Sequence, residues 1–463
     1  MINNYKQIKQ LNDLDNIFRA ALDKVDPYKL IKENIKLSNF NLTIKYKEKQ
    51  KSYGLRKFNK VFIIGAGKAT FKMAKAMEEI LQNIISSGII SVKHGYKETL
   101  KSESSNQLKN IKVIESGHPV PDNSSIKAAR VIEKLAEESD ENTLFINLIS
   151  GGGSALLCYP YKYQDISLTL KDIQITNQTL LECGADITEI NCIRKHISQI
   201  KGGKLLELLY PAKCITLILS DVIGDKLDTI ASGLTTYDNS TFKDAKSIIV
   251  KYKISNKLPD NVLKIISLGY SGKIRETIKI NDRVLKNCDN YIIGTNYTAL
   301  KTALKKADEL GYNTNILKTD IIGEAKEAAE VFIITVKNIL KSPIKKPECI
   351  IAGGETTVTI KGTGKGGRNQ ELALSFLNEL KNLPDNKNIY FLSASTDGND
   401  GPTDAAGAFA CREVLKSAEA KYLEMGKYLS DNNSYNFFKQ AGFLYKTGLT
   451  NTNVCDIQIL IVE

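Results

Sequence analysis

The chain of 463 residues lacks the features that mark several special classes of protein. No segment approaches the roughly 18 consecutive apolar residues that a membrane-spanning helix needs. The longest apolar runs, such as 214–219 and 457–462, have the length of strands. The polar N-terminal segment lacks the apolar core of a secretory signal. We therefore expect a cytoplasmic protein that does not use a membrane as a partner.

Metal-binding and disulfide motifs are also missing. None of the eight cysteines forms a C-x-x-C pair, and the three histidines are scattered, so no zinc-binding spacing arises. Several cysteines, including Cys214 and Cys349, lie within apolar segments. Buried free thiols in a reducing compartment are the expected state of these side chains.

Charge of one sign is in excess. The formal net charge is +12 and the pI is about 9.0, which suits nucleic acid, a membrane surface or an anionic small molecule as partner. Lysine is used heavily along the whole chain. The cations beside candidate ligand loops lie in glycine-rich turns and do not follow a helix face, so we expect a small anion and no nucleic acid.

The order of apolar segments predicts an α/β fold. From residue 60 onward, short β-branched runs alternate with helical stretches, which is typical of a mostly parallel sheet covered by helices on both faces. A lysine-rich region over 241–285 indicates a boundary between two domains. Residues 1–57 are expected to form two polar helices and a charged, solvated stretch over 45–57. The predicted strands cover 61–64, 111–115, 143–149, 214–219, 291–293, 349–352, 390–394 and 455–462.

The segment GAGKAT follows the first predicted strand. Gly65 and Gly67 permit a tight turn, and Lys68 adds a positive charge where a helix begins, which favours a phosphate or a carboxylate. A Walker A loop is excluded because Phe62 stands where its first glycine is needed, and Thr70 replaces the third glycine of a dinucleotide fingerprint. A structural turn with a surface lysine remains the alternative.

The segment SGGGSALL follows another predicted strand. Three consecutive glycines are costly to order, but they suit a backbone that wraps an anion with its N–H groups. Ser154 is placed to cap the next helix and to donate to a ligand. We favour an anion site here over a flexible turn.

A third glycine-rich segment, GTGKGGRNQEL, carries two cations. Glycines surround Lys365 and Arg368, and a helix is predicted from Asn369 onward. Arginine offers planar, bidentate recognition of phosphate or carboxylate. A solvent-exposed hairpin is the alternative.

Carboxylates follow two of the predicted strands. Asp221 comes directly after an apolar strand, and Asp397 and Asp404 lie in the loop STDGNDGPTDAAG. Such groups can act as a general base or hold Mg²⁺, although capping and turn formation are common roles of aspartate. Anion-binding loops together with acidic strand ends are the groups that phosphoryl transfer requires.

A set of motifs gives a specific resemblance. GAGKA, SGHPVPD, LISGGGSALL, SDVIGD, ASGLTTYD, GGETTV, GKGGRNQE, STDGNDGPTDAAGA and TGLTNTNVCDI occur in this order from about residue 60 to the C-terminus. The sequence resembles the glycerate 2-kinase family, whose C-terminal part is called the MOFRL domain and whose members have also been labelled hydroxypyruvate reductases. The MOFRL region corresponds to residues 348–460.

The resemblance implies ATP-dependent, Mg²⁺-assisted phosphorylation of D-glycerate at its 2-hydroxyl. It implies a Rossmann-like N-terminal α/β domain, which we place at 1–245 with the N-terminal helices included, and a mixed α/β C-terminal domain at 246–463. The active site is then expected in the cleft between the two. The residues that the family regards as key fall on Lys68, Asp221 and Arg368.

The candidate site has three groups of residues. Lys68, Asp221 and Arg368 are the candidate catalytic residues, and Asp397 and Asp404 are candidate Mg²⁺ ligands. Arg194 is a candidate for the glycerate carboxylate, with a surface helix position as the alternative. The candidate substrate- and phosphate-binding residues are Gly65, Gly67, Ser150, Gly151, Gly152, Gly153, Ser154, Arg194, Gly353, Glu355, Lys365, Gly366, Gly367 and Asn369.

Some matters stay open at this point. Leu449 and Asn451 replace the proline and glycine that family members usually show in the loop TGLTNTNV, so this loop departs from the family pattern. An NAD(P)H-dependent hydroxypyruvate reductase and a non-catalytic sensor of sugar acids or phosphates are the alternative functions. A homodimer is compatible with the sequence.

Overall fold

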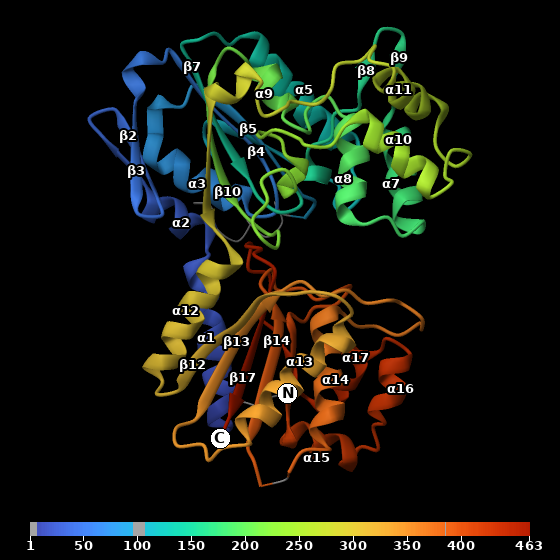
Figure 1. Ribbon diagram of the computed structural model, residues 1–463. Coiled ribbons are helices and arrows are strands. Elements are labelled where there is room, and N and C mark those ends of the chain that lie inside the picture. The colour runs from blue at the N-terminus through green and yellow to red at the C-terminus, as the bar shows by residue number, and fades with distance from the viewer. Residues whose placement is uncertain (1–6, 96–106, 385) are drawn as a thin grey trace. The chain divides into compact units, whose positions relative to one another are not determined.

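A computed structural model describes residues 7–95, 107–384 and 386–463 (Figure 1). The chain forms two compact units. Unit 2 comprises Pro27–Ile293, and unit 1 comprises the N-terminal segment up to Asp26 together with Gly294–Glu463. Each unit has its own sheet and its own buried core.

Unit 2 is built on a six-stranded sheet. Its order is β11-β10-β7-β4-β5-β6, and the neighbours from β10 to β6 pair in parallel. Because the chain order runs outward in both directions from β4 and β7, the topological switch point lies between these two strands, as in a Rossmann fold. The bounds are β4 (Lys60–Ala66), β5 (Ser87–Lys93), β6 (Ile111–Ser116), β7 (Thr143–Ile149), β10 (Lys213–Leu219) and β11 (Cys288–Gly294).

Amphipathic helices cover this sheet. In α3 (Thr70–Leu81), the buried residues Met73, Ala74, Met77 and Leu81 recur at helical spacing, so one face of the helix packs on the strands. All seven residues of β7 are buried, as expected for a strand covered on both faces. Further helices of unit 2 are α2 (Pro27–Asn34), α5 (Asn123–Glu137), α6 (Gly153–Leu156) and α9 (Lys204–Leu209).

A small antiparallel sheet over residues 35–54 replaces part of the predicted helical region and most of the charged, solvated stretch predicted over 45–57. The strands β1 (Ile35–Ser38), β2 (Asn41–Tyr46) and β3 (Lys49–Gly54) pair in the order β1-β2-β3. Leu42 and Ile44 are buried on alternate positions of β2, whereas the lysines of β3 are exposed. The lysine content conceals this alternation, which is why the sequence did not reveal the strands.

A helical layer completes unit 2. The helices α7 (Leu170–Glu182), α8 (Ile187–His196), α10 (Phe242–Lys251) and α11 (Asp260–Tyr270) share a core that contains Ile173, Ile193, Phe242 and Ile265. A short hairpin, β8 (Lys162–Tyr163) with β9 (Ile166–Ser167), adjoins it. This shared core keeps residues 246–293 with the residues before them, so unit 2 extends beyond the predicted division after residue 245.

Unit 1 contains a mixed sheet. Its order is β12-β13-β17-β14-β15-β16, with one parallel pair, β12 with β13, and antiparallel pairs elsewhere. This agrees with the mixed α/β architecture expected for the C-terminal half of the chain. The bounds are β12 (Asn313–Ile321), β13 (Glu348–Gly354), β14 (Ile389–Ser395), β15 (Gly407–Cys411), β16 (Leu444–Tyr445) and β17 (Asp456–Val462).

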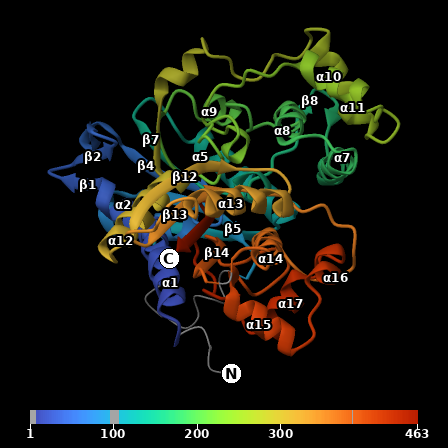
Figure 2. The same ribbon diagram turned by 60° about the horizontal axis from the view of Figure 1, so that its bottom comes forward.

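The helices of unit 1 come from both ends of the chain. Figure 2 shows α13 and α14 side by side, and α14 lies on β14 and β15. The helix α1, from the N-terminal end, packs against α12 and also contacts β17 and β14. The bounds are α1 (Lys9–Lys24), α12 (Asn296–Glu309), α13 (Ala325–Ile339), α14 (Arg368–Leu380), α15 (Arg412–Ala420), α16 (Met425–Ser430) and α17 (Ser434–Ala441).

Side-chain contacts attach α1 to unit 1. Phe18 is fully buried, and its ring meets that of Tyr445 edge to face at 5.3 Å. The hydroxyl of Tyr445 donates to Asp15 Oδ1 at 2.7 Å, and that of Tyr312 donates to Asp13 Oδ2 at 2.6 Å. The first helix is therefore part of the core of unit 1, although the prediction had assigned it to the N-terminal domain.

Two expectations about composition can be compared with the structure. In the part of the chain that the structure describes, no helix is both long and apolar enough to cross a membrane. All eight cysteines are free thiols, and six of them are buried, as expected from their apolar sequence surroundings.

We predict that Phe18→Ala destabilises unit 1 by about 3–5 kcal/mol, because it removes a fully buried aromatic ring. Hydrogen exchange in increasing urea measures the free energy of unfolding separately for the two sheets. The amide protons of β14 and β17 should exchange faster in the variant. Phe40→Ala is the matched control, because Phe40 is 46% exposed, and we expect an effect within about 0.5 kcal/mol. Equal loss of protection in β4 and β7 of unit 2 would contradict the prediction.

Candidate active site

The loops that follow β4 and β7 meet at the switch point of the sheet in unit 2. The N–H of Lys68 donates to the carbonyl of Gly151 at 2.9 Å, and the N–H of Ala69 donates to Ser150 Oγ at 3.0 Å. In return, the N–H of Ser150 donates to the carbonyl of Ala66 at 3.2 Å. In open α/β sheets this edge is where ligands bind, so the two loops define the candidate site.

Glycine is required at two positions of this junction. Gly67 has φ +146°, and a Cβ atom there would lie 2.0 Å from Ser150 Oγ. Gly152 has φ +83°, and its Cβ would lie 2.9 Å from the ring of His118 and 3.5 Å from Lys68 Cγ. The stem of Lys68 and the ring of His118 therefore both lie against Gly152.

Two other candidate glycines serve packing inside strands. A Cβ on Gly65 in β4 would lie 2.4 Å from the carbonyl oxygen of Leu148. A Cβ on Gly353 in β13 would lie 2.0 Å from Asn296 Oδ1. The close approach that these glycines permit is to the protein itself.

A cavity of about 210 Å³ lies beside the loop after β7. None of the described residues that line it is acidic, and two of them, Arg194 and Lys201, are cations. The cavity is therefore positive, which suits a small anion. Its other polar residues are His118, Gly152, Ser154 and Asn177.

Both cations of the cavity are held by neutral partners. Arg194 Nε donates to Asn177 Oδ1 at 2.8 Å, and Lys201 Nζ donates to the carbonyl oxygen of Ser154 at 2.7 Å. Burial lowers the pKa of Arg194 from its usual value and lowers that of Lys201 to about 8. An incoming anion would relieve the unfavourable burial of both charges.

Two backbone donors belong to residues that line the same space. The N–H groups of Gly152 and Ser154, which both line the cavity, make no hydrogen bond within the described part of the chain. Gly153 is also confined, because a Cβ there would lie 3.0 Å from Ala231 Cβ. The helix α6 that follows is a single turn, so the N–H groups themselves are the donors available to an anion.

A chain of hydroxyl contacts supports this loop. Ser154 Oγ lies 2.9 Å from Ser232 Oγ, which donates to Asn191 Oδ1 at 2.9 Å. Ser232 and the preceding Ala231 have φ +58° and +48°. Two adjacent non-glycine residues in this region cost of order 1–3 kcal/mol each, and such strain is commonly found at functional sites.

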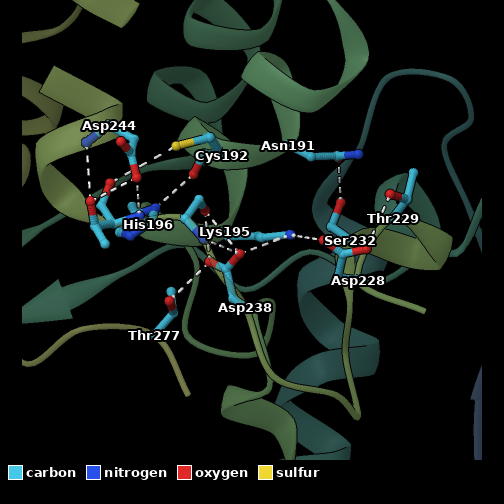
Figure 3. A network of polar contacts seen from close by, with 12 residues as sticks. Asn191, Cys192, Lys195, His196, Asp228, Thr229, Ser232, Asp238, Asp244 and Thr277 are labelled. Carbon is cyan, nitrogen blue, oxygen red and sulfur yellow. Dashed lines mark hydrogen bonds and ion pairs between the residues drawn. The ribbon is translucent and has the colours of Figure 1, made fainter. Parts of the chain in front are cut away.

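A buried ion pair fixes the helix that carries Arg194. Lys195, the next residue of α8, donates from Nζ to Asp238 Oδ1 at 3.0 Å and lies 3.5 Å from Asp228 Oδ2 (Figure 3). Thr277 Oγ1 also donates to Asp238 at 2.9 Å. Burial alone would raise the pKa of Asp238, but Lys195 and Ser240 hold it below its usual value. The pair anchors α8 beside the cavity.

Asp221 lies at the same edge of the sheet. It follows β10, which pairs with β7, and it is half-buried, whereas the preceding Ser220 is buried. The carboxyl ends of β4, β7 and β10 therefore present Lys68, the Ser150–Ser154 loop and Asp221 along one edge.

The remaining candidate residues belong to unit 1. Arg368 begins α14, and its Nε and Nη2 donate to the two oxygens of Asp456 at 2.6 and 3.0 Å. Its Nη1 lies 2.8 Å from Glu355 Oε1. Burial alone would lower the pKa of Arg368, but Asp456 and Glu355 raise it above its usual value. The sequence did not indicate either partner as an ion pair of this arginine.

The N-terminus of α14 already holds an anion that the protein supplies. Asp400 accepts hydrogen bonds from the N–H groups of Asn369 and Gln370 at 3.0 and 2.9 Å, and also from Gln370 Nε2 at 2.9 Å. Burial raises the pKa of Asp400 to about 6. The N–H groups of Asn369 and Gln370 in this first turn are thus occupied, although the sequence favoured an external anion there.

The glycines before α14 are required by protein contacts. A Cβ on Gly366 would lie 2.3 Å from Ser434 Oγ, and one on Gly367 would lie 2.4 Å from Asp400 Cγ. Lys365 Nζ lies over the ring of Tyr435, 4.8 Å from its centroid. Packing therefore accounts for the glycine pattern of this segment without a phosphate.

The two candidate metal ligands have other partners. Asp397 Oδ1 accepts from Ser395 Oγ at 2.9 Å and from the N–H of Asn399 at 3.0 Å. Asp404 accepts from Lys446 Nζ and from Tyr435 OH, each at 2.7 Å, and these contacts lower its pKa. Among the described residues, no group of three or more His, Cys, Asp or Glu is arranged to hold a metal ion.

The unusual loop TGLTNTNV is held by hydrogen bonds. Thr450 Oγ1 donates to the carbonyl of Thr396 at 2.6 Å, and Thr452 Oγ1 donates to that of Val25 at 2.8 Å. Asn451 has φ +57°, a region that asparagine tolerates better than most residues other than glycine. The replacement of glycine is therefore accommodated, and Leu449 is 58% exposed.

The sequence interpretation named no site role for His118, Asn177 or Lys201. His118 belongs to the quoted motif SGHPVPD, and Lys201 precedes two glycines in the segment KGGK. These two motifs could have pointed to His118 and Lys201 as site residues. Only the packing of separate loops shows that His118, Asn177 and Lys201 line one cavity.

We predict that Asp400→Asn destabilises unit 1 by about 1–3 kcal/mol, because it turns one accepting oxygen into an NH₂ group that faces N–H donors. Urea unfolding and hydrogen exchange in α14 measure the loss. Asp320→Asn is the control for the change in charge, since Asp320 is exposed. Equal stability of the two variants would contradict the assignment of Asp400 as the cap of α14.

Comparisons with known proteins identify the family of the chain. Residues 13–267 match the family described as "Domain of unknown function (DUF4147)", and residues 348–456 match the MOFRL family. A glycerate 2-kinase of Pyrococcus horikoshii is 39% identical over 96% of this chain and 95% of its own length. A D-glycerate 2-kinase of Thermotoga maritima is 38% identical over 94% of this chain and 99% of its own.

A solved structure is similar as well. The crystal structure of a glycerate kinase from Thermotoga maritima matches with a TM-score of 0.80 and 36% identity, over 99% of this chain and all of the other. Similarity of sequence and structure over nearly the full length of both proteins goes beyond a shared fold. The chain therefore belongs to the glycerate 2-kinase family, with a MOFRL region in its C-terminal part.

Proposed function

We propose that this chain transfers the γ-phosphoryl group of ATP to the 2-hydroxyl of D-glycerate, giving 2-phospho-D-glycerate and ADP. Full-length similarity to proteins named glycerate 2-kinase supports this reaction. The single structural observation that carries it is the small cavity beside the loop after β7, which is lined by the buried Lys201, the half-buried Arg194 and, among the described residues, no acidic side chain. A cytoplasmic location and a homodimer stay predictions.

The cavity is proposed to bind glycerate by its carboxylate. Arg194 and Lys201 supply the two positive charges, and the N–H groups of Gly152 and Ser154 supply further donors. The neutral partners of the two cations, Asn177 and the Ser154 carbonyl, keep the charges unneutralised before the substrate binds. A three-carbon acid matches the small volume.

The transfer step assigns roles to three further residues. Glycerate O2 attacks the γ-phosphorus, the bond to the β–γ bridging oxygen breaks, and Asp221 takes the hydroxyl proton. Lys68 is proposed to neutralise negative charge on the transferred group. Arg368 stays paired with the buried Asp456 in this scheme. Its second partner, the half-exposed Glu355, is the carboxylate that a phosphate oxygen would displace.

Magnesium is proposed to arrive with ATP. When bound with the nucleotide, Mg²⁺ would neutralise negative charge on the phosphates of ATP. Asp404 does not fit as its protein ligand, because Lys446 and Tyr435 already donate to its two oxygens. We therefore derive no step through a metal held by Asp397 or Asp404.

The purified protein should form ADP with ATP and Mg²⁺ only when D-glycerate is present. Phosphorus NMR of the product should place the phosphate on C2. ADP formation no higher than in the blank without glycerate would refute the proposed function. Phosphate on C3 would retain a kinase but overturn the assigned position.

We predict that Lys68→Ala lowers kcat about 10²- to 10³-fold, which is the usual cost of removing one group that stabilises charge in a transition state. Steady-state assays at saturating ATP and D-glycerate measure it. Lys36→Ala is the matched control, because Lys36 is an exposed lysine of the same unit. Full turnover by Lys68→Ala would remove this lysine from the mechanism.

The pKa of Lys201, about 8, predicts a pH dependence. Below pH 8 the free protein carries the charged amine that the glycerate carboxylate needs, and above pH 8 the amine loses its proton. The kcat/KM for D-glycerate should therefore fall up to tenfold per pH unit above 8. Lys201→Met should lower kcat/KM and abolish its fall above pH 8. A wild-type kcat/KM that stays constant up to pH 10 would contradict the role of Lys201 in binding the carboxylate.

A further inference from the structure

A second cavity, of about 410 Å³, lies wholly within unit 1. One wall is the extended segment 356–360, which follows β13, and another is the glycine-rich segment that leads to Arg368. Pro402, Glu371 and Asn432 also border the space. No residue of this cavity except Arg368 and its two neighbouring glycines entered the candidate site.

The backbone of one wall carries unpaired polar groups. Thr357 donates its N–H to the carbonyl of Gly323 at 2.8 Å, and its own carbonyl accepts from the N–H of Ala325 at 2.8 Å. In an extended chain, the N–H and C=O groups of neighbouring residues point in the opposite direction. The groups of Thr356 and Val358, both on the cavity wall, make no hydrogen bond within the described part of the chain.

These unpaired groups have a definite chemical complement. An N–H and a C=O of one residue form a donor beside an acceptor, and the edge of adenine offers an acceptor nitrogen, N1, beside the donor amino group N6. The side chains of Val358 and Pro402 provide apolar surface for the faces of a planar ring. In addition, Glu371 is 2% exposed and its Oε1 has no partner among the described residues.

The charges around this cavity disfavour an anion in its interior. Arg368 is the one cation among its described lining residues, and Asp456 and Glu355 already pair with it. The N–H of Gly364 donates to the carbonyl of Asp431 at 2.9 Å, so this part of the loop is not a phosphate nest. A neutral aromatic group suits the interior better, and the volume lies within the usual range of ligand pockets.

We propose that this cavity binds the adenine base of ATP, with the N–H and C=O of Val358 pairing to N1 and N6 and with Arg368 on the side of the phosphates. The identity of the ligand as a nucleotide rests on the proposed function. The cavity supplies what the glycine-rich loops do not, namely a site that distinguishes one nucleotide base from another.

Photolabelling with 2-azido-ATP tests the location directly. Ultraviolet irradiation of the full chain with this probe, digestion and mass spectrometry should place the label within residues 356–368 or beside Pro402. ATP should suppress the labelling at concentrations at which GTP does not. Label confined to peptides of unit 2, or equal suppression by GTP, would overturn the proposal.

A variant that fills the cavity tests it by kinetics. Val358→Trp should raise KM for ATP at least tenfold and leave KM for D-glycerate within twofold of the wild type. Ile334→Trp is the matched control, because Ile334 is 49% exposed on α13 and does not line the cavity. An unchanged KM for ATP in folded Val358→Trp would overturn the proposal.

The two proposals fail in different ways. Lack of glycerate-dependent ADP formation by the wild-type protein would contradict the proposed reaction, whereas the photolabel does not depend on turnover and still decides where adenine binds. Conversely, if the protein phosphorylates glycerate but the label lies outside this cavity, the proposed reaction stands and the proposed adenine site is wrong.

Discussion

The candidate site depends on the contact between the loop after β4 and the loop after β7. Backbone hydrogen bonds join Lys68 to Gly151 and Ser150 to Ala66, and glycine at 67 and 152 lets the two chains and the ring of His118 come this close. Rossmann topology brings these two strands together at the sheet's switch point. Because the loops hold one another, the donors beside the cavity are fixed before any ligand binds, and less ordering entropy is lost on binding.

The two units use similar sequence patterns in different ways. In unit 2 the cations Arg194 and Lys201 have neutral partners, so their charge is available to a ligand. In unit 1 the chain's own carboxylates take the corresponding places, since Asp456 pairs with Arg368 and Asp400 caps α14. A glycine-rich loop with a cation is therefore not by itself an anion site, and the partner that comes from elsewhere in the chain decides the outcome.

Much of the fold could be predicted from the sequence because the core strands are apolar and short. Thr143–Ile149, for example, matches its predicted bounds. The strands around Leu42 were missed because lysines mask their alternation. The sequence showed which loops carry charged and glycine residues, but it did not show which side chains would bond to one another. The hydrogen bond between Asp400 and Asn369, for example, joins residues 31 positions apart.

The placement of α1 in unit 1 has a consequence for how the protein is made. This helix leaves the ribosome before unit 2, yet its buried residues Leu14 and Phe18 belong to a core whose strand β17 is synthesised only after unit 2. At about 5–20 residues per second, tens of seconds separate the two. During that time unit 2 can fold completely, while the apolar face of α1 waits without its sheet. A nascent chain of this protein therefore presents an exposed amphipathic helix, which is the kind of surface that chaperones bind.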